Sequence, residues 1–247
     1  MVRLLLQSGK VADINQGSVR GYTPLQVAAG SHAPTIIRLL LDNGADVNRG
    51  NPLLTAVWSG NVDVVRELLR QDDIDVNAQD SWARTALLEM AQCGNIRITK
   101  LLLASRHINV NHVGGPMRSS ALALAVSFGH YHVVRLLLAR EDIDVSTLFW
   151  SDRGQFKHAL TVGDEATVRE LLQHAGVRTS LTTEQGKDVL STAVRHGNMG
   201  VVRALLAHNG VDVTWPLWLD HQLLEMAYRL LGLEKNVVVR SKMYKGR

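Results

Sequence analysis

The chain has 247 residues, of which 46% are hydrophobic and 20% charged, and its formal net charge is +4. This length suffices for one or two globular domains. A single cysteine, Cys93, excludes an internal disulfide and favours a reducing compartment, so we expect a cytoplasmic protein, with the nucleus left open. No apolar run approaches the roughly 20 residues that a membrane span needs, and residues 1–6 are too short for a signal peptide.

The positive charge is concentrated at one end of the chain. Residues 235–247 contain five basic residues and no acidic one, and the remaining 22 basic residues compare with 23 acidic residues. A nucleic-acid-binding domain usually carries a basic face on its body. We therefore interpret residues 235–247 as a solvated basic tail. Binding of nucleic acid or another anionic surface through this tail is the alternative function.

Residues 1–17 look like the second half of a two-helix unit. Leu4, Leu5 and Leu6 fit the apolar face of a helix, but no first helix precedes them. An end unit usually presents a polar outer face. Either the chain is part of a longer, multidomain protein, or another protein covers this end, and we favour the first explanation. In both cases we expect these leucines to be partly uncovered.

Residues 18–50 form the clearest unit. Thr23 is a suitable N-cap, and Pro24 fits the first helical position, where its missing N–H costs nothing. The apolar residues of this helix share one face: Leu25, Ala28 and Ala29. A second apolar run at 36–41 predicts another helix, which Gly44 can end as a C-cap glycine. So small a helix pair cannot bury its own apolar face, and it therefore predicts copies of itself.

The copies follow along the chain. A basic residue of the second helix recurs at steps of 35, 28, 34, 35, 34 and 34 residues: Arg3, Arg38, Arg66, Lys100, Arg135, Arg169 and Arg203. A glycine recurs between the two helices: Gly60, Gly94, Gly129, Gly163 and Gly197. An Asp-Val-Asn-like exit follows the second helix in most units, as in Asp46-Val47-Asn48. The chain is therefore predicted to be a repeat array.

The segment Thr23-Pro24-Leu25-Gln26-Val27-Ala28 resembles the ankyrin signature Thr-Pro-Leu-His-x-Ala, with Gln26 in place of histidine. This resemblance covers nearly the whole chain. It implies an all-α ankyrin-repeat solenoid of stacked helix-turn-helix units with short hairpin loops. The predicted boundaries are an ankyrin-repeat domain at 1–234, divided into 1–17, 18–50, 51–79, 80–113, 114–146, 147–180, 181–214 and a partial cap at 215–234, and a basic tail at 235–247.

Two irregularities give local predictions. The 28-residue step after Arg38 indicates that residues are missing between Asn48 and the next helix, so we expect no projecting loop there. His32 stands where later repeats have glycine. We therefore expect the turn between the two helices of this repeat to differ from the others.

The histidines and the cysteine do not form a catalytic or metal-binding pattern in the sequence. His130 and His132 have no cysteine or carboxylate companions at zinc spacing, and His130 fits a turn between helices. Cys93 ends a first helix, at a position that repeats use for contact or leave exposed. We therefore predict no enzyme, no cofactor and no metal site.

The ankyrin resemblance implies that first helices and loop tips line a concave face that binds other proteins, as in a scaffold or adaptor. Core positions are occupied by packing, so residues that vary between repeats are the candidates for binding a partner of unknown identity. Tryptophan and arginine are enriched at interface hot spots, although Trp150 equally fits a gap-filling role in an irregular repeat. The predicted binding residues are Tyr22, Trp58, Ser81, Trp82, Arg84, Gln92, Met117, Ser127, Phe128, Trp150, Arg153, Lys187, Arg195 and His196.

Overall fold

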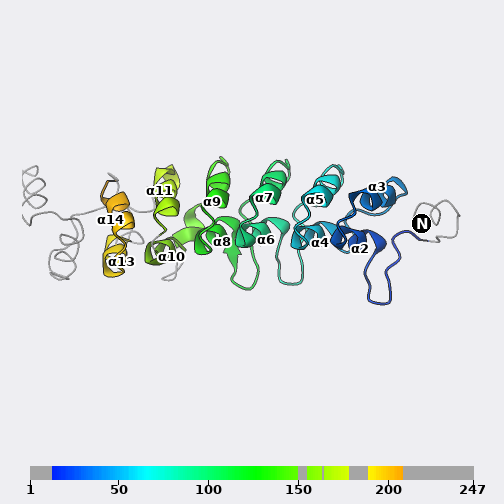
Figure 1. Ribbon diagram of the computed structural model, residues 1–247, viewed down its shortest axis with the longest axis horizontal. Helices are drawn as coiled ribbons and strands as arrows, with labels where there is room; N and C mark the ends of the chain where they lie inside the picture. Colours follow the sequence, from blue (N-terminus) through cyan, green and yellow to red (C-terminus); the bar gives the residue numbers. More distant parts are fainter. Residues whose placement is uncertain (1–12, 150–154, 163, 178–188, 208–247) are drawn as a thin grey trace, which may run out of the picture. The chain divides into compact units, whose positions relative to one another are not determined.

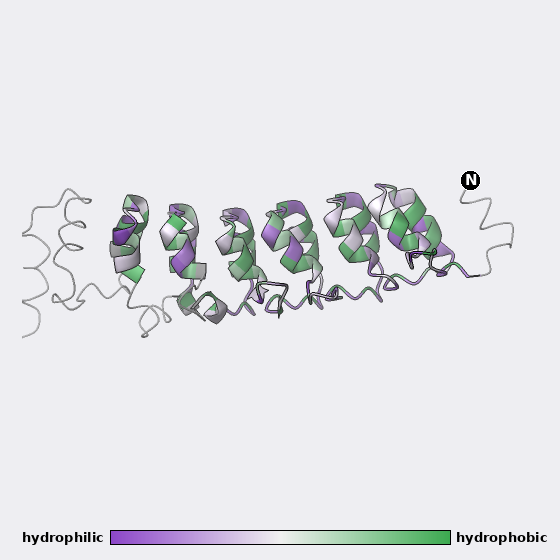
Figure 2. Ribbon diagram, turned by 90° about the horizontal axis from the view of Figure 1, so that it is seen from below, coloured by the Kyte–Doolittle hydropathy of each residue, from purple (hydrophilic) through white to green (hydrophobic). Residues whose placement is uncertain are grey.

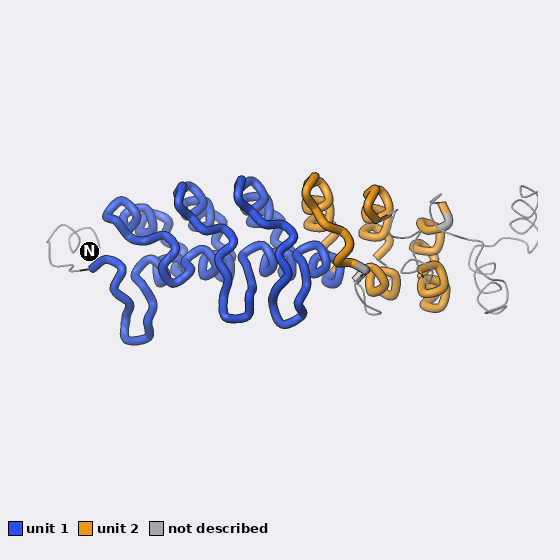
Figure 3. The backbone as a smooth tube through the Cα atoms, turned by 180° about the vertical axis from the view of Figure 1, so that it is seen from behind, with its two compact units in different colours: residues 1–128 blue, residues 129–247 orange. Residues whose placement is uncertain are grey.

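The computed structural model describes residues 13–149, 155–162, 164–177 and 189–207. The chain divides into two compact units, unit 1 at residues 1–128 and unit 2 at residues 129–247 (Figure 3). Most of the half repeat predicted at 1–17, with its leucines, lies outside the described residues. The partial cap at 215–234 and the basic tail lie outside them entirely.

Unit 1 is built from helix pairs arranged in two rows (Figure 1). The first row contains α2 (Pro24–Gly30), α4 (Pro52–Trp58), α6 (Ala86–Cys93) and α8 (Ala121–Ser127). The second row contains α3 (Pro34–Asp42), α5 (Val62–Leu68) and α7 (Ile96–Leu103). Along the first row α2 contacts α4, α4 contacts α6 and α6 contacts α8, while α3, α5 and α7 contact one another in turn. The predicted all-α stack of helix-turn-helix units is confirmed.

Unit 2 repeats the same arrangement. Its described elements are α9 (Tyr131–Leu138), the short 3-10 helix η1 (Ser146–Phe149), α10 (Gln155–Val162), α11 (Glu165–Gln173), α13 (Val189–Arg195) and α14 (Met199–Leu206). The first helices α10 and α13 contact each other, and the second helix α11 contacts both α9 and α14. The irregular repeat predicted at 147–180 therefore keeps its helix pair.

The helix starts follow the sequence signals. The side-chain oxygen of Thr23 accepts a hydrogen bond from the N–H of Gln26 at 3.1 Å. Thr85 and Ser120 cap α6 and α8 in the same way. At the end of α3, Gly44 has a φ of 84° and the N–H of Ala45 donates to the carbonyl of Leu40 at 3.0 Å. The predicted N-cap Thr23 and the predicted helix end at Gly44 are thus confirmed.

The helices are amphipathic, and Figure 2 shows hydrophobic and hydrophilic residues sharing them. Small side chains lie at the centre of the first row, where Ala29, Ala56, Ala91 and Ala125 are fully buried. The second row contributes larger aliphatic side chains, among them Ile37, Leu68 and Leu102, which are also fully buried. Burial of one face of every helix against its neighbours is the main stabilising contribution.

The turns between helices use a left-handed residue followed by an N-cap. Gly60 and Gly94 have φ angles of 69° and 71°, and the side chains of Asn61 and Asn95 cap the next helices. Asn198 differs, because its side chain does not cap α14. It donates instead to the carbonyls of Leu160 and Thr161 in the preceding repeat.

The prediction that the turn at His32 differs from the others is wrong. His32 takes a φ of 53°, in the same left-handed region as the bridge glycines. A residue with a Cβ atom is strained in this region by about 1–2 kcal/mol. The surrounding packing of α2 and α3 therefore imposes the standard turn on an unsuitable residue.

His32→Gly is expected to raise the free energy of unfolding by about 0.5–1 kcal/mol. The strain is removed, but glycine also gains freedom in the unfolded chain, which offsets part of the gain. Urea denaturation of both proteins measures the difference. His32→Ala is the control, because it removes the imidazole and keeps the strain. If both variants gain equally, the imidazole and not the backbone is responsible.

The exit motif forms a hydrogen-bonded ladder between repeats. The carboxylate of Asp46 accepts from the N–H of Asn48 at 2.9 Å and fixes the turn. The amide of Asn48 then joins the next repeat, accepting from the N–H of Asp75 at 2.8 Å and donating to the carbonyl of Asp73 at 2.8 Å. Asn77 makes the same pair of bonds to the N–H of Asn109 and the carbonyl of His107. This ladder is a physical reason for the recurring Asp-Val-Asn.

Asn77→Ala is expected to lower the free energy of unfolding by about 1–3 kcal/mol. It removes two hydrogen bonds and leaves the N–H of Asn109 and the carbonyl of His107 without their partner. Asn77→Asp keeps an oxygen that can accept from the N–H of Asn109 but places a second carboxylate oxygen against the carbonyl of His107, so it is also expected to be less stable than the wild type. Chemical denaturation measures both. Equal stability of Asn77→Ala and the wild type would contradict the ladder's role.

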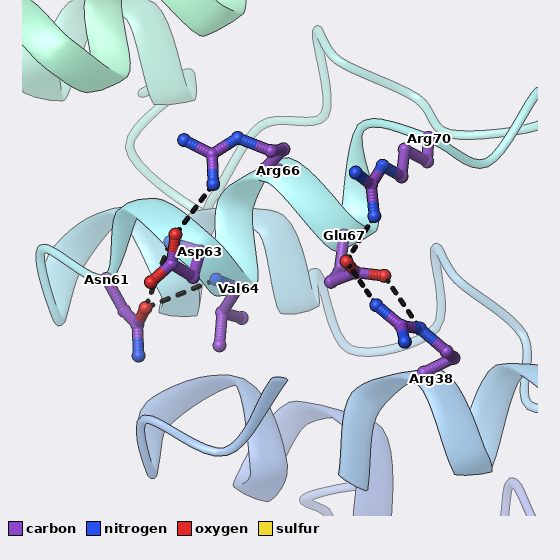
Figure 4. A network of polar contacts seen from close by, with 7 residues as sticks. All are labelled: Arg38, Asn61, Asp63, Val64, Arg66, Glu67 and Arg70. Carbon is purple, nitrogen blue, oxygen red and sulfur yellow. Dashed lines mark hydrogen bonds and ion pairs between the residues drawn. The ribbon is translucent and has the colours of Figure 1, made fainter. Parts of the chain in front are cut away.

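An ion-pair network joins the second-row helices α3 and α5 (Figure 4). Arg38 lies 2.7 Å from a carboxylate oxygen of Glu67, which also pairs with Arg70. The hydrogen bond from Arg38 is the main reason that the pKa of Glu67 lies below its usual range. A lowered folded-state pKa means that this stabilisation is present above the unfolded-state pKa and is lost as the pH falls. Because Arg38 is exposed, the contribution is small.

Candidate functional site

Four loops lead into the first helices of unit 1: loop A (16–22), loop B (48–51), loop C (78–84) and loop D (112–119). Loops A, C and D project from the helices (Figures 1 and 3). Loop D is a small hairpin in which β1 (Val113–Gly114) pairs antiparallel with β2 (Ser119–Ser120). Loop B is a tight turn closed by the N–H of Asn51 and the carbonyl of Asn48 at 3.0 Å. The predicted absence of a projecting loop between Asn48 and α4 is confirmed.

Loops C and D are tied together. The N–H of Gly115 donates to the carbonyl of Trp82 at 2.9 Å, and Nε2 of His112 lies 2.9 Å from the carbonyl oxygen of Ala83. A Cβ atom on Gly114 would lie 1.9 Å from that same oxygen, so only glycine permits this approach. Loops C and D therefore present one continuous surface, with Trp82 on one loop and Met117 on the other.

Arg84 connects loop C with the first-row helices. Its guanidinium carbon lies 5.4 Å from the ring centroid of Trp58 on α4, a cation–π contact between neighbouring repeats. Its nitrogens also lie 2.8 Å from a carboxylate oxygen of Asp80 and 3.6 Å from one of Glu89. Burial would raise the pKa of Asp80, but hydrogen bonds from Arg84 and Trp82 outweigh it and lower the pKa. Arg84, predicted as a contact residue, thus also fixes the loop.

The predicted aromatic and methionine residues of unit 1 are exposed. The exposed fraction is 63% for Trp82, about half for Tyr22, Trp58 and Met117, and 46% for Phe128. The other exposed large hydrophobic residues of the described chain are Val19, Val27 and Val162. All of them lie on a loop, on a first helix or at its end. The described second-row helices expose none.

The remaining predicted residues divide into three groups. Ser81 is exposed on loop C, and Arg195 and His196 are exposed in unit 2. Gln92 and Ser127 are half-buried, which leaves less of each side chain for a partner. Trp150, Arg153 and Lys187 lie outside the described residues.

Sequence reasoning missed several exposed residues of the same surface. Val27 is exposed on α2, away from the apolar face formed by Leu25, Ala28 and Ala29, and the sequence analysis did not single it out. Three arginines lie on loops A, B and D: Arg20, Arg49 and Arg118. A comparison of the sequences of loops A to D would have found them, because each of the four loops contains one arginine.

The chemical groups near this surface do not favour catalysis. Sγ of Cys93 lies 3.7 Å from a carboxylate oxygen of Glu89. Burial first, and then the charge and hydrogen bond of Glu89, raise the pKa of the thiol and so reduce the reactive thiolate. Among the residues that the structure describes, no three His, Cys, Asp or Glu side chains are grouped to hold a metal ion. No helix in these ranges is long and apolar enough to cross a membrane.

Comparison with known proteins agrees with this architecture. The family model for ankyrin repeats in three copies matches residues 1–80 and 53–147, and a single ankyrin-repeat model matches residues 185–215. The chain belongs to the ankyrin repeat family. Ankyrin repeats are generally protein–protein interaction modules, and members of the family are typically non-catalytic.

The ankyrin chain is also similar to individual proteins. It is 29% identical over 207 residues, or 82% of its length, to the Ankyrin repeat and KH domain-containing protein mask-1 of Caenorhabditis elegans, of which it spans only 8%. It is 29% identical over 45% of its length to the Putative ankyrin repeat protein YahD of Escherichia coli, of which it spans 59%. Over 84 residues it is 36% identical to Alpha-latrotoxin-Lg1a of Latrodectus geometricus, of which it spans 6%.

Two solved structures share the fold. The ankyrin repeat protein EF0377 matches with a TM-score of 0.62 and 24% identity, covering 70% of this chain and 90% of EF0377. The ankyrin repeat domain of Bcl-3, a member of the IkappaB family, matches with a TM-score of 0.64 and 24% identity, covering 76% and 87% of the two chains. These likenesses support the ankyrin fold.

Proposed function

We propose that this ankyrin-repeat chain is a non-catalytic scaffold or adaptor module that binds a partner protein. In unit 1 the binding surface comprises loops A, B, C and D, the exposed residues of α2, α4 and α6, and Phe128 at the end of α8. We call this surface the loop face. It contains the predicted contacts Tyr22, Trp58, Trp82, Met117 and Phe128.

The distribution of exposed apolar side chains is the observation that carries this proposal. Large hydrophobic residues left in water usually mark interaction sites when they gather on one part of a surface. Here all the described ones belong to loops and first helices, including Trp58 and Trp82, whose residue type is favoured at hot spots. The hydrogen bonds between loops C and D support it, because an ordered surface loses little entropy on binding.

Photo-crosslinking through the single cysteine tests this proposal. A photoreactive group attached to Cys93, which is exposed on α6 beside Glu89, is expected to crosslink the partner in an extract from the source cells. The matched control is Cys93→Ser combined with Lys100→Cys, which moves the probe to the exposed side of α7. Mass spectrometry identifies the captured proteins. Equal capture from both positions, or capture only from position 100, would contradict the loop face.

A further inference from the structure

Charged residues are segregated in unit 1. The loops and first helices from 16–30, 48–58, 78–93 and 112–128 contain four arginines and only two acids, Asp80 and Glu89. Both acids face Arg84, at 2.8 and 3.6 Å. The other described acids of this unit lie on the second helices and exit turns: Asp13, Asp42, Asp46, Asp63, Glu67, Asp72, Asp73 and Asp75. The loop face is therefore basic, although the body as a whole is nearly neutral.

The three remaining arginines are free to bind. Arg20, Arg49 and Arg118 are exposed on loops A, B and D, and within the described residues none of them forms an ion pair. A guanidinium presents several donors in a fixed planar arrangement that matches a carboxylate. Successive repeats are spaced by about 8–10 Å of helix packing, so these arginines extend over roughly 30 Å.

Apolar groups lie among these arginines. Trp58 is the last residue of α4, and loop B, which precedes α4, is too short to project. Arg84 covers one face of the Trp58 ring, yet about half of the tryptophan remains exposed. Val27 on α2 and Trp82 on loop C are exposed on the neighbouring repeats.

We propose that the loop face recognises an extended acidic segment of the partner that carries a large apolar side chain, an inference that rests on the proposed protein-binding function. Carboxylates of the segment pair with Arg20, Arg49 and Arg118. Its apolar side chain packs against Trp58.

The contacts favour a peptide over a nucleic acid. Bases bind by stacking on free aromatic faces, whereas one face of Trp58 is already covered by the guanidinium of Arg84. Val19, Val27 and Met117 offer aliphatic and thioether surface, which suits leucine, isoleucine or phenylalanine of a peptide.

Selection from a random peptide library tests this inference. An extended peptide spans about 3.3 Å per residue, so displayed peptides of about 12 residues are long enough to reach from loop A to loop D. Selection against the whole chain is expected to enrich peptides rich in Asp and Glu that contain an aromatic residue or leucine. Their binding is expected to weaken with rising salt concentration.

Two triple variants that remove the same amount of positive charge distinguish the loop face from the second-row helices. Arg20→Gln, Arg49→Gln and Arg118→Gln together are expected to weaken binding of the enriched peptides about tenfold or more, since three ion pairs are lost. Arg97→Gln, Lys100→Gln and Arg106→Gln together, on α7 and its exit turn, are expected to leave binding within about twofold, since only long-range attraction changes. Thermal unfolding checks that both variants fold.

Three results would overturn the proposal. The enriched peptides could lack acidic residues, or bind both triple variants equally, and still lose affinity for Trp82→Ala. This result would refute the acidic segment and leave the protein-binding function standing. Peptides insensitive to every loop-face change, or no enrichment, would count against both proposals. A single-stranded oligothymidylate of about 12 nucleotides could bind as tightly as the peptides and lose its affinity for the variant that lacks Arg20, Arg49 and Arg118. This result would identify a nucleic-acid site instead.

Discussion

Leu137→Ala is expected to lower the free energy of unfolding by about 2–5 kcal/mol. Leu137 lies on α9 and is fully buried, so the truncation removes apolar contact and leaves a cavity. In a repeat array each repeat is stabilised by its neighbours, so the loss of stability is expected to spread to the adjoining repeats. Urea denaturation followed by circular dichroism measures the change.

The control for Leu137→Ala is Arg135→Ala on the same helix. Arg135 is exposed, and a surface replacement of this kind usually changes stability by no more than about 0.5 kcal/mol. Equal losses from the two variants would mean that the burial of Leu137 does not control stability at α9.

Trp82→Ala is expected to leave the melting temperature almost unchanged and to weaken partner binding by about 1–4 kcal/mol if it is a hot spot. The indole is 63% exposed, and the hydrogen bonds of this residue are made by its backbone. Its N–H donates to Asp80 at 2.8 Å, and its carbonyl accepts from Gly115 at 2.9 Å. Alanine keeps both bonds, so loops C and D stay joined.

Thermal unfolding gives the first half of this test. If Trp82→Ala destabilises the protein as much as Leu137→Ala, the indole belongs to the core, and the placement of loop C within the loop face is wrong. Trp58→Ala provides a comparison, because Trp58 contacts Arg84 and is expected to affect loop order as well as binding.

The features that local sequence determines were predictable. Thr23-Pro24 and Thr85 mark helix starts because the capping hydrogen bond forms within one turn. The short step after Arg38 revealed the tight loop B, since the helix register on either side is kept. The exit motif was recognised as a recurring pattern. Its ladder of hydrogen bonds to the next repeat, through Asn48 and Asn77, requires the stacked structure to be seen.

Tertiary packing overrides local preference in two of the turns between helices. His32 takes a left-handed φ that its side chain disfavours, because α2 and α3 must meet as the other helix pairs do. Asn198 has the sequence of an N-cap, yet its amide hydrogen-bonds to carbonyls of the preceding repeat. No pattern within one repeat indicates either outcome.

The candidate surface was only partly predictable. Exposure of Trp58, Trp82 and Met117 follows from their register in the repeat. The contact between Arg84 and Trp58 joins two repeats through the conformation of loop C, so it could not be read from sequence positions. A net charge averaged over the body also conceals the basic loop face, because acids on the exit turns cancel its arginines.

The binding surface is tested most directly by titrating the captured partner into the wild type, Trp82→Ala and Lys100→Ala, with calorimetry at one salt concentration. The proposed loop face predicts an affinity roughly 5-fold to 1,000-fold weaker for Trp82→Ala, the range that corresponds to about 1–4 kcal/mol. It predicts wild-type affinity for Lys100→Ala, whose side chain lies on α7 in the second row. Wild-type affinity for Trp82→Ala together with a loss for Lys100→Ala would contradict it and place the partner on the second-row helices.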